Sequence, residues 1–71
     1  MANMPINQFW ARYNATVGFQ KHQRRGQYLF NMLDDTRPDL SKVVRGNVQL
    51  DPFYDDSKIA VLTSWLKENW R

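Results

Sequence analysis

The chain has 71 residues, 42% of them apolar and 14% aromatic, so its composition is typical of one small folded domain and not of a disordered segment. The absence of cysteine excludes a disulfide framework, a thiolate nucleophile and every cysteine-based metal site, and a single histidine excludes a multi-histidine site. No apolar run is long enough for a transmembrane helix, and no signal peptide is recognisable, so we expect a cytoplasmic protein.

The first predicted helix begins after Asn3, a favourable N-cap residue, and carries Pro5 in its opening turn, where a missing N–H costs nothing. Apolar side chains then follow at helical spacing at Phe9, Trp10, Tyr13 and Val17. Gly18 interrupts this pattern, and we expect it to cap the helix or to bend it.

The second predicted helix runs roughly from Phe19 to Asp34. One of its faces is formed, at steps of four, three and four residues, by His22, Gly26, Leu29 and Leu33. Phe19 and Phe30 flank this stripe. A glycine within it would allow a neighbouring helix to approach closely, although glycine costs about 1 kcal/mol in a helix interior. The alternative is that Gly26 breaks the segment into two pieces.

The third predicted helix is short. Thr36 and Asp39 have the spacing of a capping box, and Pro38 falls in the first turn. Its small apolar face consists of Leu40, Val43 and Val44. Gly46 is expected to close this helix.

Residues 47–54 lack helical periodicity, and Asp51 followed by Pro52 indicates a turn. A short alternation of apolar and polar residues here has no partner strand elsewhere in the chain, so no hairpin is predicted. We expect an irregular loop that Phe53 and Tyr54 pin to the core.

The fourth predicted helix begins after Asp55, a good N-cap residue, and Asp56 adds a second negative charge in the first turn. Tyr54 and Ile59 have the spacing of a hydrophobic staple. The buried stripe is expected to contain Ile59, Leu62, Leu66 and Trp70, widened by Val61 and Trp65. The chain is therefore predicted to form a single all-α domain over residues 1–71, with three to four helices and an irregular loop before the C-terminal helix.

The charge of the chain is uneven. Residues 1–33 contain four basic and no acidic residues, a charge of +4, whereas residues 34–71 contain six basic and seven acidic residues, a charge of −1. The basic residues of the first part are Arg12, Lys21, Arg24 and Arg25. Such a surface suits nucleic acid, an acidic protein surface or an anionic membrane, and the alternative is a merely solvated face.

The second predicted helix carries most of these basic residues in its first half, with Asp34 and Asp35 at its end. The helix dipole prefers the reverse arrangement by about 0.3–1 kcal/mol per charge. The conflict is offset if the cations pair with Asp55 or Asp56, or it marks a surface retained for binding. The remaining alternative is that these charges are exposed and screened, and cost little.

The stretch from Arg24 to Asp56 contains R-R-G-Q, a Phe-Asn pair, R-P-D-L and D-P-F-Y-D-D, ahead of a tryptophan-containing C-terminal helix. In these motifs, which span nearly half of the chain, the sequence resembles a set of short proteins encoded in phage and prophage genomes. The resemblance implies a viral or mobile-element origin and, by analogy with other small phage proteins, an accessory factor that binds a host protein. It implies no activity, ligand or site residue.

Catalysis is not expected. His22 shares a helical face with apolar positions and has no carboxylate near it in sequence, so we interpret it as packing against the core. The aspartate pairs at 34–35 and 55–56 lack the alternating spacing of a calcium loop, although one or two carboxylates would suffice for Mg²⁺. The three glycines are scattered and form no phosphate-binding loop. We therefore predict no enzyme, no cofactor and no metal site.

A helix-turn-helix that binds DNA is not favoured. With Gly18 as the turn glycine, Arg24 and Gln27 occupy positions that need apolar anchors. With residues 38–45 as the reading helix, Asp39 faces the phosphates. The nucleic-acid hypothesis that remains is weak, mainly nonspecific phosphate contact by the basic cluster.

Protein binding is the leading hypothesis. Three Trp, three Tyr and four Phe are many for so short a chain, and Trp10 and Trp70 lie near its ends, where partial exposure is expected unless all tryptophans are core. The predicted partner-binding residues, on the second helix, are Lys21, Arg24, Arg25 and Tyr28. The expected partner is a host protein or a second copy in a homodimer, and the alternative is nucleic acid bound by the same cluster. Neither a membrane nor a small-molecule substrate is predicted.

Overall fold

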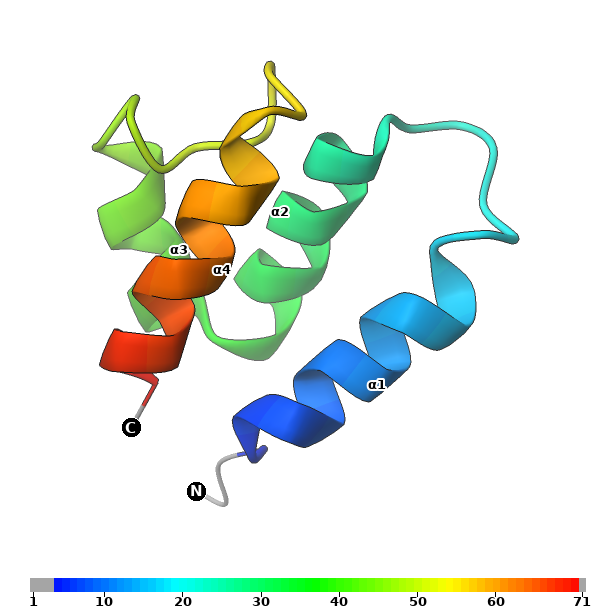
Figure 1. Cartoon of the computed structure of the whole chain (residues 1–71), viewed down its shortest axis with the longest axis horizontal. Helices are drawn as coiled ribbons and strands as arrows, with labels where there is room; N and C mark the ends of the chain where they lie inside the picture. Colours follow the sequence, from blue (N-terminus) through cyan, green and yellow to red (C-terminus); the bar gives the residue numbers. More distant parts are fainter. Residues whose placement is uncertain (1–3, 71) are drawn as a thin grey trace.

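The structure, a computed structural model, describes residues 4–70, and within this range the chain is helical apart from its connections (Figure 1). The helices are α1 (Ile6–Thr16), α2 (Arg25–Thr36), α3 (Pro38–Arg45) and α4 (Lys58–Asn69). No strand occurs among the described residues. The predicted all-α class with an irregular loop before the last helix is therefore confirmed. None of the helices in residues 4–70 has the length and apolar character needed to cross a bilayer.

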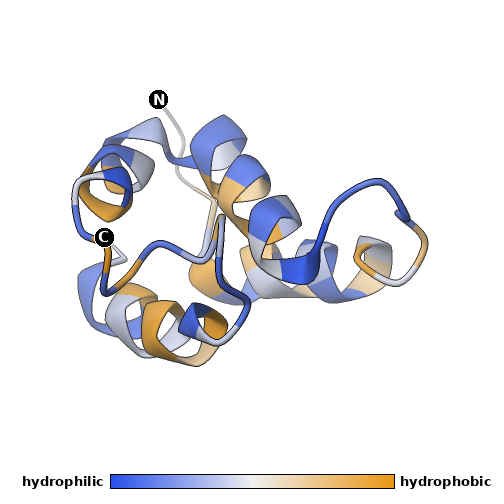
Figure 2. Cartoon of the chain, turned by 90° about the horizontal axis from the view of Figure 1, so that it is seen from above, coloured by the Kyte–Doolittle hydropathy of each residue, from blue (hydrophilic) through white to orange (hydrophobic). Residues whose placement is uncertain are grey.

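The core takes side chains from every helix. Fully buried apolar side chains are Phe9, Leu29, Leu33, Val44, Leu62 and Leu66. Each of these positions was predicted from helical spacing, and burying apolar surface is the main force that holds the helices together. The prediction for Val43 is wrong: we expected its side chain on the buried apolar face of α3, but it is 52% exposed. Figure 2 shows that each helix carries both polar and apolar residues.

Helix α1 begins after Pro5, whose backbone is extended and whose carbonyl oxygen accepts hydrogen bonds from the N–H groups of Gln8 and Phe9. Proline suits this position because it needs no backbone donor. The predicted cap, Asn3, lies outside the described residues. Gly18 follows the end of α1, as predicted, without a left-handed backbone conformation.

Aromatic side chains dock α1 on the remainder of the domain. Phe9 meets Trp70 with ring centroids 5.1 Å apart, and Tyr13 stacks on Tyr28 at 6.0 Å. The indole Nε1 of Trp70 also donates to the carbonyl oxygen of Met4 at 2.8 Å. The two ends of α1 are thus held by separate aromatic pairs.

Helix α2 begins at Arg25 and not at Phe19, which corrects the prediction. Gln20 explains part of the difference, because its side chain donates to the carbonyl of Gln23 at 2.8 Å and accepts from its N–H at 3.0 Å. These bonds satisfy backbone groups that a helix would otherwise pair. His22 is exposed in this connection, so the predicted packing of His22 against the core is wrong. A helix here would have no buried face to stabilise it.

Gly26 lies in the first turn of α2 and is buried. A Cβ atom added to it would lie 2.1 Å from the carbonyl oxygen of Pro52. The glycine therefore permits a close approach, as predicted, but the approaching group is the backbone of the α3–α4 connection and not a helix. The alternative of a break near Gly26 is the closer description, although the segment before the break is a loop.

Arg37 alone joins α2 to α3, and it is only 8% exposed. Its carbonyl oxygen accepts from the N–H groups of Leu40 and Ser41. Its guanidinium binds both carboxylate oxygens of Asp39, at 3.0 and 2.9 Å, and this hydrogen bonding lowers the pKa of Asp39 and raises that of Arg37. Arg37 occupies the N-cap position without a side-chain cap, so the predicted capping box that starts at Thr36 is wrong.

The α3–α4 connection is held by Phe53, which is half-buried and meets the ring of Phe30 edge-on at 5.7 Å. Tyr54 is 81% exposed, so the predicted pinning by Tyr54 and its staple to Ile59 are wrong. Helix α4 begins at Lys58, later than predicted. Asp55 instead accepts hydrogen bonds from the N–H and hydroxyl of the serine two residues on, and these bonds lower the pKa of Asp55.

Candidate partner-binding surface

The four residues predicted to bind a partner do not share one helix face. Lys21 lies in the connection that precedes α2, and Arg25 opens α2; both are exposed. Arg24 and Tyr28 make contacts within the molecule. All three cations of the predicted set are exposed, but Arg24 is also engaged with Asp56 and Phe53.

Tyr28 connects α1 to α2. Its hydroxyl donates to Oγ1 of Thr16 at 2.6 Å, and its ring lies against that of Tyr13. The Tyr13 hydroxyl donates to the carbonyl oxygen of Arg25 at 3.4 Å. Burial raises the pKa of Tyr13, although the positive charge of Arg25 opposes this effect. Tyr28 therefore has a role in the fold that its position in the sequence did not indicate.

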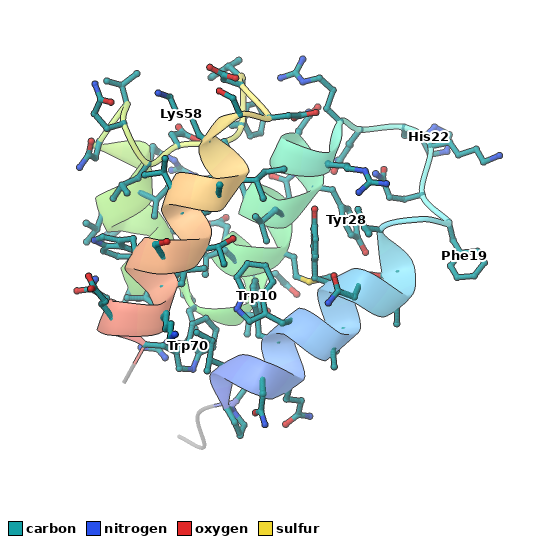
Figure 3. The ribbon with its side chains drawn as sticks, in the orientation of Figure 1. Trp10, Phe19, His22, Tyr28, Lys58 and Trp70 are labelled. Atoms are coloured by element: carbon teal, nitrogen blue, oxygen red, sulfur yellow. The ribbon has the colours of Figure 1, made fainter. Side chains whose placement is uncertain are left out.

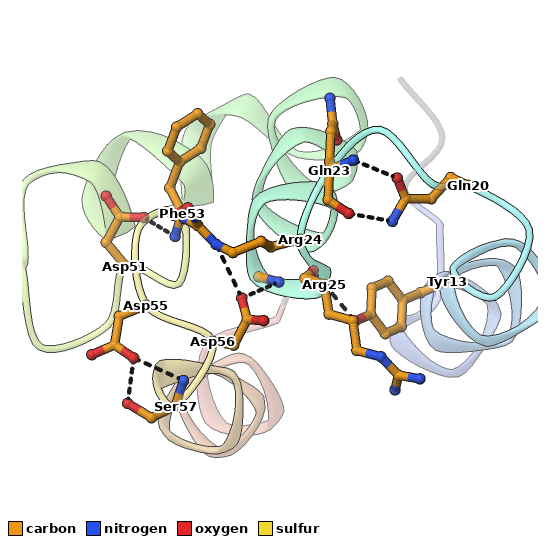
Figure 4. A network of polar contacts seen from close by, with 11 residues as sticks. Tyr13, Gln20, Gln23, Arg24, Arg25, Asp51, Phe53, Asp55, Asp56 and Ser57 are labelled. Atoms are coloured by element: carbon orange, nitrogen blue, oxygen red, sulfur yellow. Dashed lines mark hydrogen bonds and ion pairs between the residues drawn. The ribbon is translucent and has the colours of Figure 1, made fainter.

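Asp56 binds the N-terminus of α2 (Figure 4). Its Oδ1 atom accepts from the N–H of Gly26 at 2.9 Å and lies 3.8 Å from Nε of Arg24. Nη2 of Arg24 also donates to the carbonyl oxygen of Phe53 at 2.5 Å. A carboxylate is favourable at a helix N-terminus, so Asp56 offsets the unfavourable cations there. Of the pairings predicted with Asp55 or Asp56, the one with Asp56 is confirmed.

Replacing Asp56 by alanine is expected to lower the free energy of unfolding by about 1–2 kcal/mol, because an N-terminal cap of α2 is lost. The matched control is Asp35→Ala, which removes an exposed carboxylate at the opposite end of the same helix. That change is expected to be neutral or slightly stabilising. Urea denaturation of both variants measures the difference, and equal effects would show that Asp56 does not act as a cap.

Phe19 is the exposed aromatic residue that the sequence analysis assigned to a helix. It is 85% exposed, and Figure 3 shows its ring and His22 directed away from the helices. One feature of the sequence could have indicated this exposure. The residues three and four positions after Phe19 are His22 and Gln23, so a helix over this segment would give Phe19 no apolar neighbour in its following turn. Leaving a phenylalanine side chain in water forgoes roughly 1.5–3 kcal/mol of burial energy.

The segment of residues 17–25, here called the basic loop, contains Phe19 together with three cations and no acidic residue. Those cations are Lys21, Arg24 and Arg25. The N–H groups of Phe19 and Gln20 donate to the carbonyl oxygen of Thr16, and the Gln20–Gln23 bonds close the following turn. The loop projects from the body of the domain in both views (Figures 1 and 2). An exposed aromatic ring is thus held on a hydrogen-bonded, positively charged projection.

The alternatives weighed from the sequence, a metal site and a DNA-reading helix, can be compared with the structure. The described residues contain no group of three or more His, Cys, Asp or Glu side chains arranged to hold a metal ion. Residues 20–24 are not helical, so no recognition helix opens there. The tryptophans Trp10, Trp65 and Trp70 are partly buried and pack against the core. Their main contribution is therefore to the fold.

No protein-family model, curated protein or solved structure matches this chain.

Proposed function

We propose that the protein is a small binding protein that inserts Phe19 of the basic loop into an apolar pocket on an acidic protein surface. The observation that carries this proposal is the 85% exposure of Phe19 in a segment without a single acidic residue. Aromatic residues and arginine are the side chains that most often dominate the energy of protein interfaces. This partner is either a host protein, as the resemblance to short phage and prophage proteins implies, or a second copy of the chain.

The charges around Phe19 support an acidic partner. Lys21 and Arg25 are exposed, whereas the charge of Arg24 is partly balanced by Asp56. Exposed charges of one sign mainly accelerate association and select the partner. The aromatic side chain, which becomes buried only in the complex, provides most of the affinity. The hydrogen bonds that close the loop at Gln20 and Gln23 reduce the conformational entropy lost on binding.

Single-stranded nucleic acid is the second candidate, because one ring beside two free cations also allows a base to stack while phosphates contact Lys21 and Arg25. Two phosphate contacts provide only weak binding that falls with salt. We rank this candidate second because a single exposed ring stacks a single base.

A photo-crosslinking phenylalanine analogue at position 19, compared with the same analogue at position 48, tests the proposal in cells. Val48 is also exposed, at 77%, but it lies outside the basic loop. We expect position 19 to crosslink a defined protein that position 48 does not. Crosslinks only to nucleic acid would support the second candidate, and identical products from both positions would refute the proposal.

The purified partner then allows a quantitative test by calorimetry. Phe19→Ala is expected to weaken binding by about 30-fold or more, and Lys21→Ala by a few-fold with a weaker dependence on salt. The control Val48→Ala should bind as the unmodified protein does. Because Phe19 is 85% exposed, the free energy of unfolding of Phe19→Ala should lie within about 0.5 kcal/mol of the value for the parent protein. Equal binding by Phe19→Ala and the parent would contradict the assigned role of the loop.

A further inference from the structure

A second feature of the surface is a pocket of about 290 Å³ beside the α3–α4 connection. It is lined by Phe30, Asn31, Arg45, Asp51, Phe53 and Tyr54, and we call it the aromatic pocket. A protein cavity of about 150 Å³ accommodates a benzene molecule, so this volume is sufficient for one aromatic side chain.

The walls of the aromatic pocket suit an incoming ring. Phe53 meets Phe30 at 5.7 Å and Tyr54 at 4.7 Å, in both cases edge to face. Tyr54 is nevertheless 81% exposed, so most of its ring surface contacts solvent. Aromatic rings add favourable edge-to-face contacts with a further ring, and an exposed tyrosine is a frequent anchor of protein interfaces.

The lining of the aromatic pocket contains one carboxylate, Asp51, and one cation, Arg45, and its acidic side is the α3–α4 connection. Residues 47–57 contain three aspartates and no basic residue. Asp56 is engaged with α2. Asp51 lines the pocket and accepts a hydrogen bond from the N–H of Phe53 at 2.9 Å. The exposed Asp55 follows Tyr54 in the chain, and besides its hydrogen bonds from Ser57 the charges of Lys58 and Arg24 help to lower its pKa. The guanidinium of Arg45, although it lines the pocket, lies over the ring of Phe30 and 3.8 Å from the carboxylate of Asp34. Its charge is thus partly balanced within the molecule.

The basic loop has the complementary features. It carries an exposed phenylalanine with the exposed cations Lys21 and Arg25, whereas the pocket combines aromatic walls with Asp51 and is followed in the chain by Asp55. Within one molecule the two features do not meet, because Phe19 is directed away from the domain (Figure 3). The chain therefore presents both an aromatic anchor and an apolar, acidic receptor for it.

We infer that the partner of the basic loop is a second copy of this chain, whose aromatic pocket receives Phe19 while Lys21 and Arg25 approach Asp51 and Asp55. The inference rests on the proposed role of Phe19 as a binding anchor. Two reciprocal contacts of this kind close a two-fold dimer, whereas a single contact extends head to tail.

Analytical ultracentrifugation of the complete protein at low and high salt tests this inference. We expect association that grows with protein concentration and weakens as salt screens the facing charges. Phe19→Ala and Tyr54→Ala, both at exposed positions, should each weaken association at least tenfold while circular dichroism shows an unchanged fold. Val48→Ala, at another exposed apolar position, should associate as the parent does.

Mixing the two variants is the decisive step. The Tyr54→Ala protein retains the phenylalanine and the Phe19→Ala protein retains the pocket, so a mixed pair contains one intact contact. The mixture should therefore associate more strongly than either variant alone, although more weakly than the parent. A mixture that associates no better than either variant alone, a parent protein that stays monomeric at millimolar concentration, or variants that associate like the parent would each overturn the inference. If the parent is monomeric but position 19 crosslinks another protein, the proposed function stands and self-association alone is refuted. If position 19 crosslinks only a second copy, the inference stands and a heterologous partner is refuted.

Discussion

Replacing Gly26 by alanine is expected to destabilise the domain by about 3 kcal/mol, although alanine is the better helix former. The added Cβ would lie 2.1 Å from the carbonyl oxygen of Pro52 and 2.8 Å from Oδ1 of Asp56. Neither the backbone of Pro52 nor the capping carboxylate can move without breaking contacts, and overpacking of this kind typically costs about 1–3 kcal/mol. Separation of Asp56 from the helix would add the loss of its hydrogen bond to the Gly26 N–H.

The expected loss is a large part of the total stability, because the free energy of unfolding of a chain of this length is typically about 4–10 kcal/mol. Gly18→Ala is the matched control, since nothing lies within 4 Å of its added Cβ and its backbone is not left-handed. That change should be neutral or stabilise by up to about 1 kcal/mol, through the entropy of the unfolded chain. Urea denaturation compares the two, and a neutral Gly26→Ala would contradict the close approach of the α3–α4 connection.

Replacing Trp70 by alanine is expected to lower the free energy of unfolding by about 3 kcal/mol and to loosen α1. The indole ring packs on Phe9 at 5.1 Å, donates to the carbonyl oxygen of Met4 at 2.8 Å and lies under the guanidinium of Arg37 at 5.0 Å. One substitution therefore removes a buried ring contact, a hydrogen bond and a cation–π contact. Tryptophan-to-alanine changes in packed sites typically cost about 3–5 kcal/mol, and partial exposure of Trp70 places it at the lower end.

Amide hydrogen exchange locates the effect of the Trp70 substitution. Amides of α1 should lose protection more than those of α2 and α4, because one of the two aromatic pairs that dock α1 is removed. Trp70→Phe, which retains a ring but removes the donor to Met4, should cost about 1 kcal/mol. Val61→Ala, a change on α4 at a 45% exposed site, should cost about 0.5 kcal/mol or less. Uniform loss of protection in all helices would show that α1 does not open separately.

The side chains that hold the fold are largely distinct from those proposed to bind a partner. Asp56, Arg37 and Trp70 connect elements within the molecule, whereas Phe19 and Tyr54 are more than four-fifths exposed. Substitution of the exposed rings therefore tests binding without confounding changes in stability. Two residues that the sequence assigned to binding also hold the fold: Arg24 ties the basic loop to the α3–α4 connection, and Tyr28 connects α1 to α2.

Where an element carries its own apolar stripe, local pattern located most core positions, although Val43 and Val61, both predicted on buried faces, are 52% and 45% exposed. The periodic residues of α4 predicted the burial of Leu62 and Leu66, and Pro38 and Gly46 marked the ends of α3. The pattern failed for residues 19–24, because the apolar residue Phe19 was assigned to the helix that follows it. Polar side chains of this segment instead close a turn, and the helix begins only where Leu29 and Leu33 provide a buried face.

The sequence by itself determined the helical class, the main core positions and the uneven distribution of charge, since each of these depends on residue type and on spacing within one segment. Only the tertiary structure decided which charged and aromatic residues are free to bind. Gly26 and its cap Asp56 are 30 positions apart, and Trp70 reaches Met4 across 66 positions. Contacts between residues so distant in sequence leave no periodic signal, yet they occupy Arg24 and Tyr28 and leave Phe19 and Tyr54 exposed.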